Sequence, residues 1–102
     1  MERAEMLKQL LEQNPNDAFA RYGLAMEYSS AGEIETALAE FKKLQELHPD
    51  YTAAYQMAGQ MLANAGRYEE ARQMLESGLA CAQRAGNKHA QEEIQGMLQE
   101  LR

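Results

Sequence analysis

The feature that most constrains this chain is an internal repeat with a period of thirty-four residues. The segment AGEIETALAEF begins at Ala31, and AGRYEEARQML begins one period later at Ala65. The glycine, an acidic residue and the alanine stay in step, and Pro49 follows Pro15 by the same distance. A structural unit copied at a fixed period of this length predicts a repeat protein in which neighbouring units stack.

The amino acids available favour helices over strands. Val is absent, and Ile and Thr occur only twice each, whereas Ala, Leu, Glu, Gln and Met are abundant. These abundant residues are good helix formers, and β-branched residues are the ones that strands prefer. A length of 102 residues suits one domain with one continuous core. The composition therefore predicts a single all-α domain.

Each repeat is expected to form two helices separated by a glycine. The first helix of the first repeat places apolar or small residues one turn apart on one face, before Gly32 ends it in a left-handed conformation. Pro49 ends the second helix, and Asp50 is expected to cap the next one. The buried stripe predicted for that second helix consists of Ala37, Leu38, Phe41, Leu44 and Leu47.

This thirty-four-residue helix–turn–helix pattern resembles the tetratricopeptide repeat (TPR) family. The first repeat carries the family pattern at Leu24, Ala25, Tyr28, Gly32, Ala37, Phe41 and Pro49. The second carries it at Tyr55, Gly59, Leu62, Gly66, Tyr68, Ala71, Leu75 and Gly78. The chain departs from the pattern at Arg21, where the family often has tryptophan. It departs again at Gln83, which replaces the closing proline and predicts a helix from about Tyr68 to Gly86.

The resemblance implies a right-handed superhelical stack of antiparallel helix hairpins with about six helices. The single domain 1–102 then divides into an N-terminal helix, two repeats and a C-terminal capping helix, at 1–14, 16–49, 50–85 and 87–102. The first helix resembles half a repeat and offers an apolar face at Met6, Leu7, Leu10 and Leu11. The last helix has one apolar stripe, and its other residues are mostly Gln and Glu, as a terminal cap requires.

No arrangement of residues points to catalysis, a cofactor or a metal site. Cys81 lies on a helix without an evident partner, so we expect a buried, inert thiol. His48 and His89 lack the His, Cys or carboxylate spacing of metal ligands, although His89 and Glu93 share a helix face. The sequence also has no glycine-rich phosphate loop or nucleophile elbow. We therefore expect a protein that is not an enzyme.

Charge and hydropathy limit the classes of binding partner and the cellular compartment that are expected. A formal net charge of −6, with no basic stripe, argues against nucleic acid. No apolar run approaches the roughly 20 residues that span a bilayer, so no membrane segment is expected. The charged N-terminus after Met1 does not resemble a secretory signal, and one cysteine fits a reducing compartment. These features predict a cytoplasmic protein.

In TPR proteins the first helices of successive hairpins line a concave groove that holds a peptide, and the resemblance carries this role to nine residues. The implied groove residues are Phe19, Tyr22, Met26, Ser30, Ala53, Gln56, Met57, Gln60 and Asn64. Independently, Phe19, Tyr22 and Met26 lie one turn apart on a face offset from Leu24. The alternative is that these three side chains pack against the first helix and fill the core.

Two functions from different classes follow. The first is an interaction module that binds a peptide segment or helix of a partner protein, with apolar contacts favoured by the Phe, Tyr and Met side chains. TPR domains that clamp a C-terminal carboxylate have Lys and Asn where this chain has Tyr22 and Met26, which argues against that subtype. The second is a homo-oligomerising assembly or scaffold element, a homodimer if Met6 and Leu10 lack neighbours in their own chain.

Overall fold

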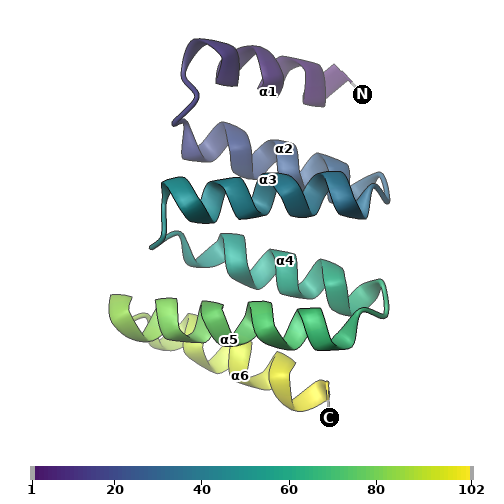
Figure 1. The fold of residues 1–102 in the computed structure, drawn as a ribbon. Coiled ribbons are helices and arrows are strands. Elements are labelled where there is room, and N and C mark those ends of the chain that lie inside the picture. The colour runs from purple at the N-terminus through teal and green to yellow at the C-terminus, as the bar shows by residue number, and fades with distance from the viewer. Residues whose placement is uncertain (1, 102) are drawn as a thin grey trace. The chain divides into compact units, whose positions relative to one another are not determined.

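A computed structural model describes residues 2–101, all of which lie in helices or short turns (Figure 1). The helices are α1 (Glu2–Gln13), α2 (Ala18–Ser30), α3 (Ile34–Leu47), α4 (Thr52–Asn64), α5 (Tyr68–Ala85) and α6 (Lys88–Glu100). The first and last residues of the predicted domain 1–102 lie outside the described part. The prediction of an all-α chain with six helices is confirmed for residues 2–101. The helices form two compact units, residues 1–48 with α1 to α3 and residues 49–102 with α4 to α6.

The glycine turns form as predicted. Gly32 and Gly66 both have a φ of +79°, in the left-handed region that glycine adopts without a Cβ clash. Each turn is closed by a hydrogen bond back into the helix that it ends. Glu33 N donates to Tyr28 O at 2.9 Å, and Arg67 N donates to Leu62 O at the same distance. The matching bonds are those of the Schellman motif, which satisfies carbonyls at a helix end.

Helix α5 continues to Ala85, as the replacement of proline by Gln83 predicts. It has 18 residues, against 14 in α3, and it ends at Gly86 with a φ of +67°. A helix continues until a residue breaks its hydrogen-bond ladder, and the first such residue here is a glycine instead of a proline.

Side-chain caps begin two helices, but the cap predicted at Asp50 is wrong. Asp17 Oδ1 accepts a hydrogen bond from Ala20 N at 3.0 Å, and Asn87 Oδ1 accepts one from Ala90 N at 3.0 Å. The N-cap residue of α4 is Tyr51, without a side-chain cap bond, so Asp50 lies one residue too early in the chain. Its carboxylate lies 3.8 Å from Arg84 Nη2 instead.

The core of the first unit joins α1 to α2. Its buried cluster contains Ala4, Leu7, Leu11, Ala20 and Leu24, with Tyr28 packed against it. Phe41 and Leu44 of α3 are fully buried as predicted, but Leu47 is 36% exposed. Leu47 is the last residue of α3 and belongs to no buried cluster of this unit, so the predicted stripe ends one turn earlier.

Arg21 stands where the family often has tryptophan, and its side chain is largely buried. Arg21 Nη1 donates to Glu40 Oε1 at 2.7 Å, and Nη2 donates to Pro15 O at 3.1 Å. The guanidinium therefore ties α2 both to α3 and to the turn that precedes α2. Charge-assisted bonds of this kind replace the apolar contact that a tryptophan ring would make.

The second unit packs α4 and α6 against α5. Its buried cluster contains Leu75, Ala82, Ala90 and Ile94, with Leu79, Met97, Leu98 and Leu101 packed around it. Gly59 of α4 lies directly over Leu75, because a Cβ at this position would be 2.6 Å from Leu75 Cγ and Cδ2. A Cβ at Gly78 would be 2.9 Å from the Cβ of Tyr55. Glycine is needed at both positions for the close approach of α4 and α5.

Candidate interaction surface

One stripe of α2 carries three of the predicted groove residues. Phe19, Gly23, Met26 and Ser30 follow one another at spacings of four, three and four residues, which places them on one helix face. Phe19 is 70% exposed, Met26 is half-buried and Ser30 is exposed. The alternative that Phe19 fills the core is therefore wrong. Its ring is an apolar surface that this chain leaves open to solvent.

Tyr22 occupies a different position from Phe19. Its ring meets Phe41 of α3 edge to face, with the centroids 6.4 Å apart and an interplanar angle of 68°. Aromatic pairs with this geometry are favourable beyond the area that they bury. The half-buried Tyr22 thus packs on the third helix, whereas the core alternative placed it against the first.

Helix α1 extends this surface of α2 with two apolar side chains. A Cβ at Gly23 would be 3.2 Å from Leu7 Cδ1 and 3.8 Å from Arg3 Nη2, so this side of α1 reaches the stripe of α2. Arg3 Nε also lies 3.3 Å from Glu27 Oε1 of α2. Met6 and Leu10 follow Arg3 by three and seven residues, on the same side of α1, and are 51% and 41% exposed.

We call Met6, Leu10, Phe19 and Met26 the apolar platform of the first unit. Two of its members, Met6 and Leu10, were missing from the groove residues inferred from sequence. The available signal was the pairing of Met6 and Leu10 beside Leu7 and Leu11, since that apolar face is wider than one neighbouring helix covers. Leu7 and Leu11 are buried, and the other two are left exposed.

The predicted groove residues of α4 form a more polar face in the second unit. Gln56 Nε2 donates to Glu93 Oε1 of α6 at 3.4 Å, and Met97 Sδ lies 4.0 Å from the same nitrogen. Gln60 Nε2 donates to Asn64 Oδ1 at 3.1 Å. Ala53 and Met57 are half-buried. The amides of this face are thus engaged with α6 or with one another.

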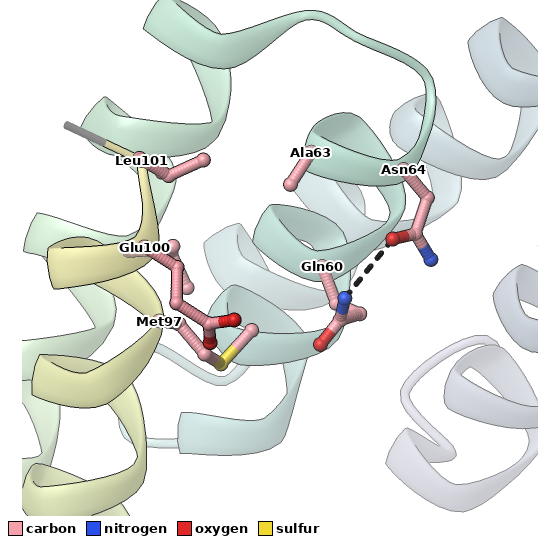
Figure 2. Close-up of a pocket in the computed structure, with 7 residues that line it drawn as sticks. Gln60, Ala63, Asn64, Met97, Glu100 and Leu101 are labelled. Carbon is pink, nitrogen blue, oxygen red and sulfur yellow. Dashed lines mark hydrogen bonds between the residues drawn. The ribbon is translucent and has the colours of Figure 1, made fainter.

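A cavity of about 160 Å³ opens between α4 and α6 at the end of this face (Figure 2). Its lining residues are Gln60, Ala63, Asn64, Leu75, Met97, Glu100 and Leu101. Two of them, Gln60 and Asn64, are predicted groove residues. The other five, from α4, α5, α6 and the residue after α6, were not anticipated from the sequence because the cavity depends on how three helices meet.

The side chains of Cys81 and Tyr55 make contacts within the second unit. Cys81 is buried as expected, but it has partners that the sequence did not suggest: Thr52 Oγ1 at 3.1 Å and Pro49 O at 3.6 Å. Tyr55 donates to the same Pro49 carbonyl at 3.0 Å. Burial of Tyr55, and secondarily the nearby Cys81, raises the pKa of its hydroxyl, which stays protonated as a donor at neutral pH.

Each of the two histidines has a polar neighbour. His48 Nε2 lies 2.8 Å from Asn16 O, and His89 Nε2 lies 3.6 Å from Glu93 Oε2 on the exposed face of α6. Within residues 2–101, no three His, Cys, Asp or Glu side chains gather in a way that could hold a metal ion. In the same residues, no helix is both long and apolar enough to cross a bilayer.

Known proteins share both the sequence pattern and the fold. A tetratricopeptide repeat family model matches residues 4–58 and again residues 28–91. A TPR repeat-containing protein of Pseudomonas aeruginosa is 34% identical over 97 residues, which cover 95% of this chain and 92% of that protein.

Two solved structures have a TM-score of 0.87 to this chain, and both cover 96% of it. One is the TPR2B domain of yeast Sti1 in its complex with pHsp70, at 17% identity over 78% of that chain. The other is PcrH in complex with the chaperone binding region of PopD, at 18% identity over 74% of that chain. At these identities the likeness concerns the fold. This chain belongs to the tetratricopeptide repeat family and has the all-α helical solenoid fold of that family.

Proposed function

We propose that this chain is a non-catalytic interaction module that binds a peptide segment or helix of a partner protein. The proposed contact residues are those inferred from the family on α2 in the first unit and on α4 in the second, with Met6 and Leu10 of α1 added in the first unit. The observation that carries the proposal is that Phe19, Met6 and Leu10 are large apolar side chains left exposed on α1 and α2 of one unit. An exposed group of large apolar side chains on a small domain is typical of an interaction site.

The chemistry of the apolar platform favours an amphipathic partner segment. Flexible Met side chains adapt to different apolar partners, and a large aromatic ring is a frequent source of binding energy. Two structures of the same fold were solved in complexes, the TPR2B domain of Sti1 with pHsp70 and PcrH with the chaperone binding region of PopD. The fold can therefore accommodate a bound partner, and the exposed side chains of this chain determine which kind of segment it prefers.

Replacing Phe19 with serine should weaken binding of such a segment about 30-fold. This is the effect of losing a central apolar anchor at an interface, about 2 kcal/mol. The probe would be an amphipathic peptide selected from a random displayed library against the full chain, and fluorescence anisotropy would measure its Kd. The matched control is Tyr68→Ser, because Tyr68 is an exposed aromatic, at 57%, on α5 of the other unit. Equal losses in both variants, or no loss in either, would contradict the proposal.

The second candidate is self-association, and the exposure of Met6 and Leu10 is the observation that favours it. A helix face without a neighbour in its own chain can pair with the same face of a second copy. Covering the platform in this way would also explain why its side chains are apolar. The two functions compete for one surface and predict different molar masses.

Light scattering on the eluting protein over a wide concentration range distinguishes the two functions. The interaction module predicts a mass near 11.5 kDa at every concentration, for the wild type and for Met57→Glu. Self-association predicts a wild-type mass that rises toward twice this value. If Met6→Gln combined with Leu10→Gln restores the monomer, α1 is the contact. If Met57→Glu restores it while helicity is retained, α4 is the contact.

A further inference from the structure

The cavity at the end of α4 is built from three helices of the second unit. Gln60, Ala63 and Asn64 of α4 form one wall, and Met97 and Glu100 of α6, with Leu101 directly after it, form the opposite one (Figure 2). Leu75 of α5, which is fully buried, forms part of the lining. The cavity thus lies beside the face of α4 that carries Gln56 and Gln60.

Its size selects the kind of occupant. Pockets that hold cofactors or drug-sized ligands usually measure about 300–1,000 Å³. The 160 Å³ found here is well below that range, although it exceeds the roughly 30 Å³ that one water occupies several times over. A cavity of this volume fits a single long side chain and is too small for a cofactor.

Its lining combines apolar side chains with two amides and one carboxylate. Ala63, Leu75, Met97 and Leu101 supply apolar surface. Gln60 uses its amide nitrogen to donate to Asn64 Oδ1, which leaves the carbonyl oxygen of Gln60 as an acceptor. Figure 2 shows the side chain of Glu100 extending from α6 toward Gln60. Among the described lining residues none carries a positive charge, and the chain has a net charge of −6; the nearby guanidinium of Arg72 is engaged, since its Nη2 donates to Leu101 O at 3.0 Å.

We propose that this cavity binds one lysine or arginine side chain of the partner segment. The aliphatic stem would lie against Met97 and Leu101, and the cationic end would meet the carboxylate of Glu100. Long basic side chains commonly bury their stems on apolar surface while the charged end finds acceptors at the edge. The inference rests on the proposed function, because it names the residue type that a bound segment would place here.

The test uses two small probes of equal length and different charge. N-acetyl-lysine methylamide and N-acetyl-norleucine methylamide would each be titrated into the ¹⁵N-labelled full chain and followed by amide chemical shifts. We expect saturable shifts at Ala63, Asn64 and Leu101, with the lysine probe binding about 5-fold more tightly than the norleucine probe. This preference is what an ion pair at the edge of a partly exposed site supplies.

Variants assign the preference to the carboxylate. Glu100→Gln should abolish the difference between the two probes, whereas Glu92→Gln, an exposed acid on the same helix, should leave it unchanged. Two results would overturn the inference: equal or tighter binding of norleucine, and no saturable shift with either probe. Tyr68→Ser, at an exposed position of α5 that does not line the cavity, should not alter the lysine titration. If the selected peptides lose affinity for the Phe19→Ser variant but place no basic residue in this cavity, the inference is refuted and the proposed function stands.

Discussion

We expect Leu75→Ala to lower the free energy of unfolding by about 3 kcal/mol, within the range of 2–5 kcal/mol typical of buried leucines. Leu75 is fully buried, belongs to the core cluster of the second unit and lies against Gly59. Truncating this side chain removes buried apolar surface. It also leaves a cavity that cannot fully close, because the backbones of α4 and α5 are held in place by their other contacts. Urea unfolding followed by circular dichroism at 222 nm would measure the change.

Leu79→Ala is the matched control for this prediction. Leu79 lies one turn further along the same helix, where it is only half-buried at the edge of the same cluster. The same substitution at Leu79 should lower the free energy of unfolding by about 1 kcal/mol. Folding buries less of this side chain than of Leu75, and the neighbouring side chains can relax into the space that it leaves. If the two variants lose equal stability, the helices of the second unit are not packed around Leu75 as described.

Gly59→Ala should destabilise the protein by about 1–3 kcal/mol, although alanine is the better helix former. In an exposed helix this substitution gains roughly 1 kcal/mol. At Gly59 the new methyl group would lie 2.6 Å from two carbons of Leu75, so α4 and α5 must separate or Leu75 must leave its rotamer. Overpacking of this kind costs more than the helix propensity returns. Thermal and urea unfolding would both report the loss.

The opposite sign is expected at Gly96, where an added Cβ would meet no described atom within 4 Å beyond its chain neighbours and the adjacent backbone of its own helix. Gly96→Ala in α6 should stabilise the protein by about 0.5–1 kcal/mol. A double-mutant cycle adds a second check, because Leu75→Ala removes the atoms that the methyl group at Gly59 would strike. The double variant should therefore be more stable than the sum of the single effects predicts. Strict additivity would show that steric overlap is not the cause.

The repeat and its turns could be predicted because they depend on local geometry. Gly32 and Gly66 need a left-handed backbone, and that requirement is visible in any sequence that places glycine one residue after a helix. The length of α5 followed from the same kind of reasoning, since Gln83 permits a helix that proline would have ended. A feature that requires a particular backbone conformation restricts the residue type at that position, so it can be predicted from the sequence.

Features that depend on which neighbour is present could not be predicted in the same way. Met6 and Leu7 are both apolar, yet Leu7 is buried against Gly23 and Met6 is exposed. Asp50 is a good capping residue in isolation, but the helix begins one residue too late for it. The cavity beside Glu100 arises where the ends of α4 and α6 meet the middle of α5, so no single segment of the sequence predicts it.

The surroundings of Cys81 have a consequence for how the protein's motions could be followed. It is the single cysteine of the chain, it is buried in the second unit, and Thr52 and Pro49 surround its sulfur. A thiol reagent can reach it only when α4 and α5 come apart, because reaction requires an exposed thiolate. The labelling rate of the unmodified protein therefore reports how often the packing around Cys81 opens, and residues 1–48 contain no cysteine that could add to the signal.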